Sequence, residues 1–313
     1  MITRKYTSKL QEVLFGKKIT ILGHDNIDVD SVVSALLTSK LLRFLRIENE
    51  FLILDEVKED DTYKTLKELF GIDLKVYQRL EESEDRNLLL LDHYETSHKG
   101  TVIACIDHHP TKQKYEYDFM YVRDSCATAY LVYELMKEIS YTFLNSDIKM
   151  VVTAMLIDTV SFRSSKTIES EAYIARELAK RYKLDFELLE KYGMSLTKIE
   201  NLTDEEIISN GEKWYSYRRK NDVASSYLQL YGMPSCEVLQ HWLDLISQKC
   251  LKTKADMIVF LIYDIKAQKT HEYRVFVGRT EMVCHQGILS RGKHIMPKIE
   301  ARVLNLSKKG ESA

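Results

Sequence analysis

The stretch that decides the fold is Ile19-Thr20-Ile21-Leu22-Gly23-His24-Asp25-Asn26-Ile27-Asp28-Val29-Asp30-Ser31. It opens with a short β-branched run and continues as a polar loop, after which apolar residues recur at helical spacing from Val32 to Leu45. This order predicts a buried strand, a loop and a helix that packs on the sheet. The loop offers three side chains that could bind a metal ion: His24, Asp28 and Asp30.

Short strands and longer amphipathic stretches alternate as far as about Tyr182, which is typical of βαβ units and a parallel sheet. The predicted strands cover residues 19–22, 51–54, 88–91 and 102–106. Acidic or imidazole side chains follow three of them. Because ligands bind at the carboxyl ends of strands in open α/β sheets, we expect these three motifs to converge at one edge.

The second part of the chain has a different pattern. The segment from Glu190 to Glu206 is charged and has no strong strand signal. Beyond it, strands are predicted over 224–231, 257–263 and 273–277, with a helix over 238–251. The predicted fold class is therefore α/β, with an N-terminal parallel-sheet domain over 1–195 and a smaller C-terminal α/β domain over 196–313.

The first motif supports two interpretations. Asp28 and Asp30 are carboxylates that a hard divalent ion accepts, and an added imidazole from His24 shifts the preference from magnesium or calcium toward manganese, cobalt, zinc or iron. Alternatively, the stretch is an ordinary polar loop in which Asp30 or Ser31 caps the next helix. The residues of this motif alone leave both open.

Three further motifs carry metal-binding residue types. Asp107-His108-His109 follows a predicted strand, and because neighbouring side chains of a strand diverge, we expect one imidazole to bind metal and the other to face a substrate. Asp92 and Asp158 each come directly after an apolar run. Taken singly, such residues are more often helix caps or solvated strand ends.

In this order and approximate spacing, the motifs resemble those of the DHH phosphoesterase superfamily. The similarity is to the branch that contains family II inorganic pyrophosphatases and related exopolyphosphatases. The first motif is similar to that family's Gly-His-x-Asn-Pro-Asp-x-Asp-Ser, with Ile27 in place of proline.

The resemblance implies two metal ions, manganese or cobalt, with magnesium accompanying the substrate. One ion would be held by His24, Asp28, Asp92 and Asp158. The other would be held by Asp30, Asp92, His108 and Asp158. By the same resemblance His109 faces the substrate as a hydrogen-bond or proton donor, and Asp107 orients the histidine pair.

A second resemblance lies near the end of the chain. Ser290-Arg291-Gly292-Lys293-His294 is similar to the family's Ser-Arg-Lys-Lys-Gln, which grips the phosphates. Arg291 and Lys293 match, whereas Gly292 and His294 depart from the pattern. Lys213 is the nearest counterpart of a further family lysine, and a solvated surface lysine is an equal alternative.

The resemblance implies hydrolysis of phosphoanhydride bonds, with pyrophosphate as the leading substrate and the active site in a cleft between the two domains. Gly292 and His294 keep open an exopolyphosphatase that acts on short or long polyphosphate, or a nucleotide phosphodiesterase. A catalytically weak scaffold protein is a third hypothesis, because the phosphate-gripping motif is altered.

Composition limits the partners. The 45 basic and 47 acidic residues nearly balance, which argues against nucleic acid or a membrane surface as a partner and favours a small phosphate substrate. A homodimer is compatible with the sequence. The five cysteines form no Cys-x-x-Cys pair, and neither a signal peptide nor a membrane-spanning apolar run is visible. We therefore expect a reducing, cytoplasmic location.

Overall fold

The chain divides into two compact units in the computed structural model. Unit 1 comprises Met1–Phe162 and Lys166–Gly193, and unit 2 comprises Arg163–Ser165 and Met194–Ala313. The structure describes residues 5–25, 27–54, 56–81, 85–109, 115–194, 196–217 and 221–310. Asn26 of the first motif and Pro110 lie outside the described residues. Each unit is considered by itself below.

Unit 1 is built on a five-stranded parallel sheet with the order β2-β1-β3-β4-β5. Its strands are β1 (Ile19–Leu22), β2 (Asn49–Leu52), β3 (Asn87–Leu91), β4 (Thr101–Asp107) and β5 (Phe119–Val122). The predicted parallel sheet is confirmed. The second strand begins two residues earlier than predicted. Strand β5 was not predicted because its half-buried residues form no β-branched or leucine-rich run.

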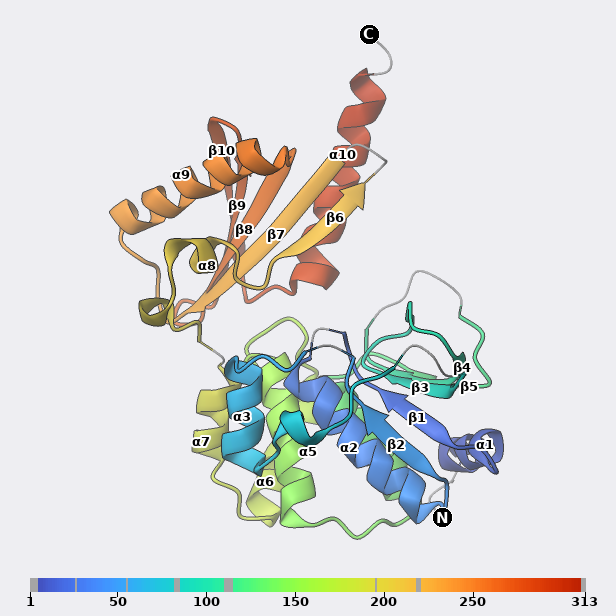
Figure 1. The fold of residues 1–313 in the computed structure, drawn as a ribbon. Coiled ribbons are helices and arrows are strands. Elements are labelled where there is room, and N and C mark those ends of the chain that lie inside the picture. Colours follow the sequence, from blue (N-terminus) through green and yellow to red (C-terminus); the bar gives the residue numbers. More distant parts are fainter. Residues whose placement is uncertain are drawn as a thin grey trace. The chain divides into compact units, whose positions relative to one another are not determined.

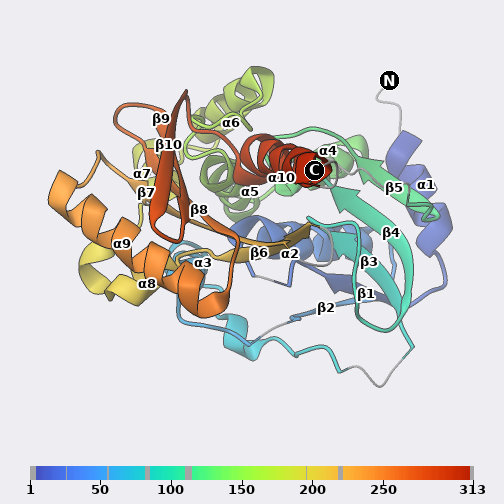
Figure 2. The same cartoon turned by 90° about the horizontal axis from the view of Figure 1, so that it is seen from above.

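The helices of unit 1 pack against the sheet face that carries Leu89 and Leu91, or against one another (Figure 1). They are α1 (Lys5–Leu14), α2 (Val29–Phe44), α3 (Asp61–Phe70), α4 (Thr128–Glu138), α5 (Asn145–Asp158), α6 (Glu169–Arg181) and α7 (Phe186–Gly193). Helices α2 and α4 pack on the strands and on α5, and Figure 2 shows α6 and α7 beside α5.

Both faces of the first sheet are buried, as parallel strands require. Alternate side chains of β3 point to opposite sides, so that Leu89 and Leu91 join the core formed with α2, α4 and α5. Leu88 and Leu90 join a smaller cluster with Leu22 on the other face. The sheet is therefore a fixed platform, and the polar residues that follow its strands are held at its carboxyl edge.

Unit 2 contains a mixed sheet with the order β10-β9-β8-β7-β6 (Figure 1). The strands are β6 (Lys213–Tyr217), β7 (Asn221–Leu230), β8 (Met257–Asp264), β9 (Lys269–Phe276) and β10 (Arg279–Gln286). Strands β7 and β8 pair in parallel, and the other pairs are antiparallel. All three predicted strands are present, whereas the two edge strands, β6 and β10, were not predicted.

The predicted helix of unit 2 is α9 (Cys236–Thr253), which covers one face of this sheet (Figure 1). Its Trp242 packs edge-on against Phe260 of β8, with ring centroids 6.5 Å apart. The remaining helical elements are 3₁₀ turns at Leu74–Val76 (unit 1) and Ile199–Asn201, α8 (Asp204–Ile208), a π-helical turn at Arg291–Ile295 and α10 (Met296–Gly310). Within the described ranges, no helix is long and apolar enough to cross a membrane.

The core of unit 1 predicts a large cost for truncating Leu131, which is fully buried in α4. We expect Leu131→Ala to lower the free energy of unfolding by about 2–5 kcal/mol, because the substitution leaves a cavity. The matched control is Leu188→Ala in α7, where the leucine is 40% exposed and the expected loss is below about 1 kcal/mol. Urea unfolding followed by circular dichroism measures both, and equal losses would contradict this account of the core.

Candidate metal centre

The predicted convergence of three motifs at one sheet edge is confirmed. Strands β1, β3 and β4 are parallel neighbours, and the polar loop, Asp92 and the Asp107–His109 motif directly follow them or end them. Asp158 does not follow a strand; it is the last residue of helix α5. Side chains that are far apart in the sequence are thereby gathered at the carboxyl edge of the first sheet.

His108 lies at the centre of this group and is only 1% exposed. Its Nδ1 faces the carbonyl oxygen of Ser125 at 2.9 Å, so this nitrogen must carry the proton and donate it. The other ring nitrogen, Nε2, has no hydrogen-bond partner, and in the neutral form of the ring it presents a lone pair. Such a buried, basic nitrogen is suited to a metal ion.

Three carboxylates face that nitrogen. His108 Nε2 lies 3.3 Å from Asp158 Oδ2, 3.4 Å from Asp92 Oδ1 and 4.0 Å from Asp30 Oδ2. These carboxylates repel one another and a lone pair on Nε2, and either a proton on that nitrogen or a metal cation among the groups relieves the repulsion. The ligand atoms of Asp30, His108 and Asp158 are all within 4.8 Å of one another, and so are those of Asp92, His108 and His109. The donor set thus fits a divalent ion that accepts nitrogen and oxygen ligands.

Asp30 is held by the first turn of α4. Its Oδ2 accepts a hydrogen bond from the Thr128 amide at 2.7 Å, and its Oδ1 accepts one from the Ala129 amide at 2.9 Å. The positive end of a helix stabilises a carboxylate in this position. Even so, burial and then the charge of Asp92 hold the pKa of Asp30 well above its usual range, as expected for a carboxylate that lacks a compensating cation.

Asp92 adopts a left-handed backbone conformation, with φ of 68°. This conformation is uncommon for a residue other than glycine and marks a position under functional or structural constraint. The side chain accepts a hydrogen bond from Thr128 Oγ1 at 2.9 Å. Burial and the neighbouring Asp28 charge raise the pKa of Asp92 well above its usual range.

Asp158 has a partner that the sequence analysis missed. Lys166 donates a hydrogen bond from Nζ to Asp158 Oδ1 at 2.5 Å, and the lysine side chain is only 17% exposed. Burial opposes ionisation of Asp158, but the charges of Lys166 and then His108 lower its pKa to about 2. A lysine eight residues beyond a predicted ligand carries no distinguishing sequence signal.

His109 is placed by Asp107, as the resemblance implied. Asp107 Oδ1 accepts hydrogen bonds from the backbone amide of His109 at 3.0 Å and from its ring Nδ1 at 2.9 Å. Burial lowers the pKa of His109. The Asp107 hydrogen bond and the Asp92 charge together raise this pKa by more than burial lowers it, so the net shift is upward. The expectation that Asp107 orients both histidines differs from the structure, where the Ser125 carbonyl orients His108.

The two remaining predicted ligands lie at the rim of the cluster. Asp28 caps α2, because its Oδ1 accepts a hydrogen bond from the Ser31 amide at 2.8 Å. The cap therefore lies two residues before Asp30 and three before Ser31, the positions that the alternative interpretation named. His24 packs edge-on against His93, with ring centroids 6.0 Å apart. Among the described residues, neither His24 nor Asp28 belongs to the two groups of converging ligand atoms.

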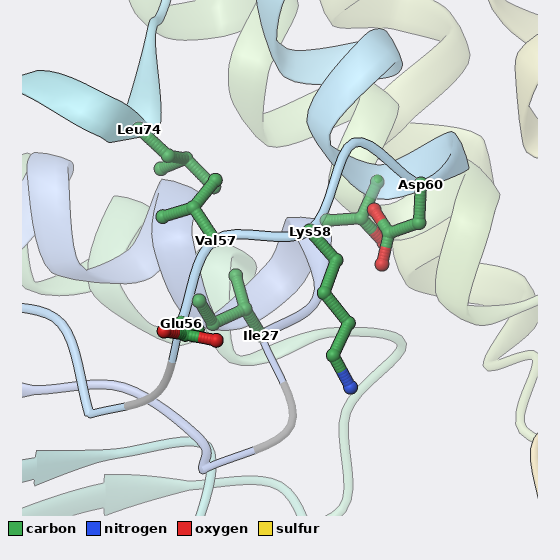
Figure 3. A pocket seen from close by; sticks show the side chains of 7 residues that line it. Ile27, Glu56, Val57, Lys58, Asp60 and Leu74 are labelled. Atoms are coloured by element: carbon green, nitrogen blue, oxygen red, sulfur yellow. The ribbon is translucent and has the colours of Figure 1, made fainter.

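A hollow of about 100 Å³ opens beside the first motif (Figure 3). In Figure 3 the apolar side chains of Leu74, Val57 and Ile27 follow one another on one side of the view, and Lys58 and Asp60 lie toward the other. A smaller hollow that shares Ile27 and Leu74 reaches His24. The converging carboxylates do not line either hollow, so the cluster is a packed polar centre rather than the floor of these hollows.

The predicted phosphate-binding residues belong to unit 2. Arg291 donates from Nη1 to the carbonyl oxygens of Gly211 at 2.5 Å and Ser225 at 3.1 Å, and its guanidinium lies 5.1 Å from the centre of the Tyr227 ring. Lys213 pairs with Ser225 across β6 and β7. Arg291 and Lys213 are therefore brought to the same point of the second sheet.

Lys293 lies in the π-helical turn that begins at Arg291. Its backbone amide donates to Ser290 Oγ at 3.3 Å, which caps this turn. His294 Nδ1 contacts Ser165 Oγ at 3.2 Å, and Ser165 belongs to unit 2. The turn is thus held at both of its ends, with Lys293 between them.

Residues 18–159 match the family model described as the DHH family, N-terminal domain. This match contains every predicted metal ligand, from His24 to Asp158. Unit 1 carries a DHH-family domain.

Two relatives that match nearly the whole chain are both named as manganese-dependent inorganic pyrophosphatases. The manganese-dependent inorganic pyrophosphatase of Methanocaldococcus jannaschii is 25% identical over 313 residues, covering 90% of this chain and 97% of the relative. A Bacillus cereus protein named "probable manganese-dependent inorganic pyrophosphatase" is 25% identical over 310 residues, with the same coverage.

The crystal structure of a Methanococcus jannaschii protein assigned to the family II inorganic pyrophosphatases has a similar fold. It superposes with a TM-score of 0.66 at 23% sequence identity, covering 91% of this chain and 98% of that one. The likeness shows a shared fold, and the predicted α/β fold class is confirmed.

The DHH-family centre has a buried support that the sequence analysis also missed. Glu171, near the start of α6, accepts hydrogen bonds at Oε2 from Ser125 Oγ and the Cys126 amide, each at 2.8 Å. Its Oε1 accepts one from Arg123 Nη1 at 2.9 Å. Glu171 therefore fixes the loop whose carbonyl at Ser125 orients His108. A glutamate in an amphipathic helix carries no sequence signal for this role.

Two buried thiols flank the same centre without taking part in it. The cysteines are all free, and Cys105 and Cys126 are buried. Burial raises the pKa of the Cys126 thiol to about 12, and it raises the pKa of Cys105 as well. Both remain protonated at neutral pH, so the ligands offered at the DHH-family centre are nitrogen and oxygen only.

Glu171 gives a test of this support. We expect Glu171→Gln to lower the free energy of unfolding by about 1–3 kcal/mol, because it removes the charge of a buried carboxylate and sets an amide against hydrogen-bond donors. Glu177→Gln is the matched control, since Glu177 is exposed on the same helix, and a change within about 0.5 kcal/mol is expected there. Urea unfolding of both variants decides, and a negligible effect at Glu171 would show that the network contributes little.

Proposed function

We propose that this protein hydrolyses inorganic pyrophosphate to two phosphates with the help of two divalent metal ions, manganese or cobalt. The observation that carries the proposal is the buried, unpartnered Nε2 of His108 opposite Asp30, Asp92 and Asp158. The names of the relatives in Methanocaldococcus and Bacillus support manganese and pyrophosphate. The chain is accordingly a metal-dependent hydrolase of phosphoanhydrides.

The proposed metal ligands form two sets, one for each ion, as the family resemblance implies. Asp30, Asp92, His108 and Asp158 would hold one ion. His24, Asp28, Asp92 and Asp158 would hold the other. When bound, such ions polarise phosphate oxygens and supply a nucleophile at neutral pH. The geometry around His108 fits the first set directly.

The protein's own residues bind the substrate and move a proton. His109, 36% exposed at its side chain, has its Nδ1 engaged by Asp107, so its Nε2 is the atom that would donate a hydrogen bond or proton to the leaving phosphate. Asp107 acts by holding that ring in place.

The second domain, over residues 196–313, would bind the phosphate groups, and the first, over residues 1–195, would hold the metal ions. Arg291 has five N–H donors, and the carbonyls of Gly211 and Ser225 fix the guanidinium through Nη1. Lys213 and Lys293 would add positive charge to the same phosphates. Magnesium accompanying the substrate would neutralise further phosphate oxygens.

Polyphosphate is the second candidate substrate, and Gly292 is the observation that favours it. The related motif has a lysine at this position, so one phosphate-binding charge is missing here. A longer substrate spreads its charge over more groups and depends less on each one. The balanced charge supports a small phosphate substrate. The free cysteines support a reducing, cytoplasmic location.

Metal dependence tests the proposed function. We expect metal-stripped protein to release phosphate from pyrophosphate only after manganese or cobalt is returned. Asp158→Ala should then lower kcat at least about a hundredfold, because losing a metal ligand costs no less than losing one of its supports. Phosphate release is measured for each metal in turn.

Asp118→Ala is the control for that experiment, since Asp118 is an exposed aspartate of unit 1. It should retain wild-type turnover and the same metal requirement. Hydrolysis by stripped wild-type protein, or near-normal turnover by a folded Asp158→Ala variant, would overturn the proposal. Activity on tripolyphosphate without activity on pyrophosphate would keep the metal centre and change the substrate.

Gly292 offers a gain-of-function test of substrate choice. A Cβ at Gly292 meets no heavy atom within 4 Å, so a side chain can be added without a clash. We expect Gly292→Lys to raise kcat/KM for pyrophosphate relative to tripolyphosphate about tenfold, the effect of one charged hydrogen bond. Gly292→Ala controls for the loss of glycine and should leave the ratio unchanged. A ratio that falls in Gly292→Lys would contradict a phosphate-binding role for this turn.

A further inference from the structure

Lys166 places a positive charge inside the metal centre. Its Nζ lies 2.5 Å from Asp158 Oδ1, while the other oxygen of the same carboxylate, Oδ2, lies 3.3 Å from His108 Nε2. With 17% of its side chain exposed, Lys166 is largely removed from water. One carboxylate is thus shared between an ammonium group and the histidine side of the cluster.

The charge of Lys166 also reaches the neighbouring carboxylates. The acidic groups whose charges act on the Lys166 ammonium are Asp158 first, then Asp92 and Asp28. Asp28, Asp92 and Asp158 are three of the four ligands proposed for the ion on the His24 side. The ammonium therefore acts on two ligands that both ions would share, Asp92 and Asp158, and on Asp28, which only the ion on the His24 side would use.

The two proposed ion sites are consequently unequal. Around His108, the ligand atoms of Asp30 and Asp158 already converge within 4.8 Å. On the other side, an ion that needs Asp158 Oδ1 meets an oxygen that Lys166 occupies. A divalent ion and an ammonium group repel each other strongly at such short range, and the more so in a partly dry site.

We propose that Lys166 is a resident cation that competes with the second metal ion for Asp158 Oδ1, so that the ion at His108 binds first and the other binds weakly. This inference rests on the proposed two-metal function and adds to it the residue that sets metal occupancy. Lys166 is here a positioning and affinity-setting residue, not a catalytic one. Its four-carbon stem lets the ammonium move aside when the second ion enters.

Manganese titration of metal-stripped protein by isothermal calorimetry tests the inference without using activity. Lys166→Met keeps the length of the stem and removes the charge, and we expect it to bind the weaker ion at least about tenfold more tightly. The affinity for the tighter ion should change less. Lys166→Arg keeps the charge and should retain the weak second site.

Lys191→Met is the matched control, because Lys191 is 65% exposed on the surface helix α7 of unit 1. It should bind both ions as the wild type does. A second readout is the Tm of the stripped protein, which should fall in Lys166→Met and then rise more on adding manganese than it does in the wild type. If Lys166→Met does not fold, Lys166→Gln carries the same expectations.

The outcomes separate the inference from the function on which it rests. Unchanged or weaker binding of both ions by folded Lys166→Met and Lys166→Gln would overturn the role of Lys166 while leaving the metal centre intact. Wild-type protein that binds no manganese would overturn the metal centre itself, and the inference with it. Tight binding of two equivalent ions by the wild type would also overturn the inference.

Discussion

Mutual repulsion among carboxylates buried at one sheet edge is the constraint on which unit 1 depends. Bringing Asp30, Asp92 and Asp158 around one imidazole costs both hydration and Coulomb energy. The fold offsets part of this cost with hydrogen-bond donors and with one positively charged side chain. The first turn of α4 binds Asp30 and Asp92, and Lys166 binds Asp158. The remaining imbalance is what makes the cluster attractive to divalent cations.

Much of this could be predicted from sequence, because parallel strands deliver the residues after them to one edge. That rule placed the first motif, Asp92 and His108 together, even though no single motif decided between a ligand and a helix cap. A helix cap does not exclude metal ligands in the same loop, since Asp28 caps α2 in the loop that carries the proposed ligands. A polar residue at the start of a helix can serve both the helix and a site beside it.

The supports of the site could not be predicted in the same way. Lys166 and Glu171 are ordinary charged residues in sequence, and their roles arise from burial against partners that are distant or unmarked. The edge strands β6 and β10 were missed because exposed strands lack a continuous apolar run, and β10 alternates exposed and half-buried residues. In unit 2 the basic residues were predicted, but not the carbonyl groups that anchor Arg291.

Because Cys105 and Cys126 are buried and protonated, their thiols should resist oxidation. Oxidants attack the thiolate rather than the thiol, and attack also requires access from solvent. Both conditions are unfavourable at these positions, although they lie close to the residues that matter most for function. Damage should instead begin at the exposed thiols of Cys236 and Cys284 in unit 2, leaving the nitrogen and oxygen ligands of the first sheet chemically intact.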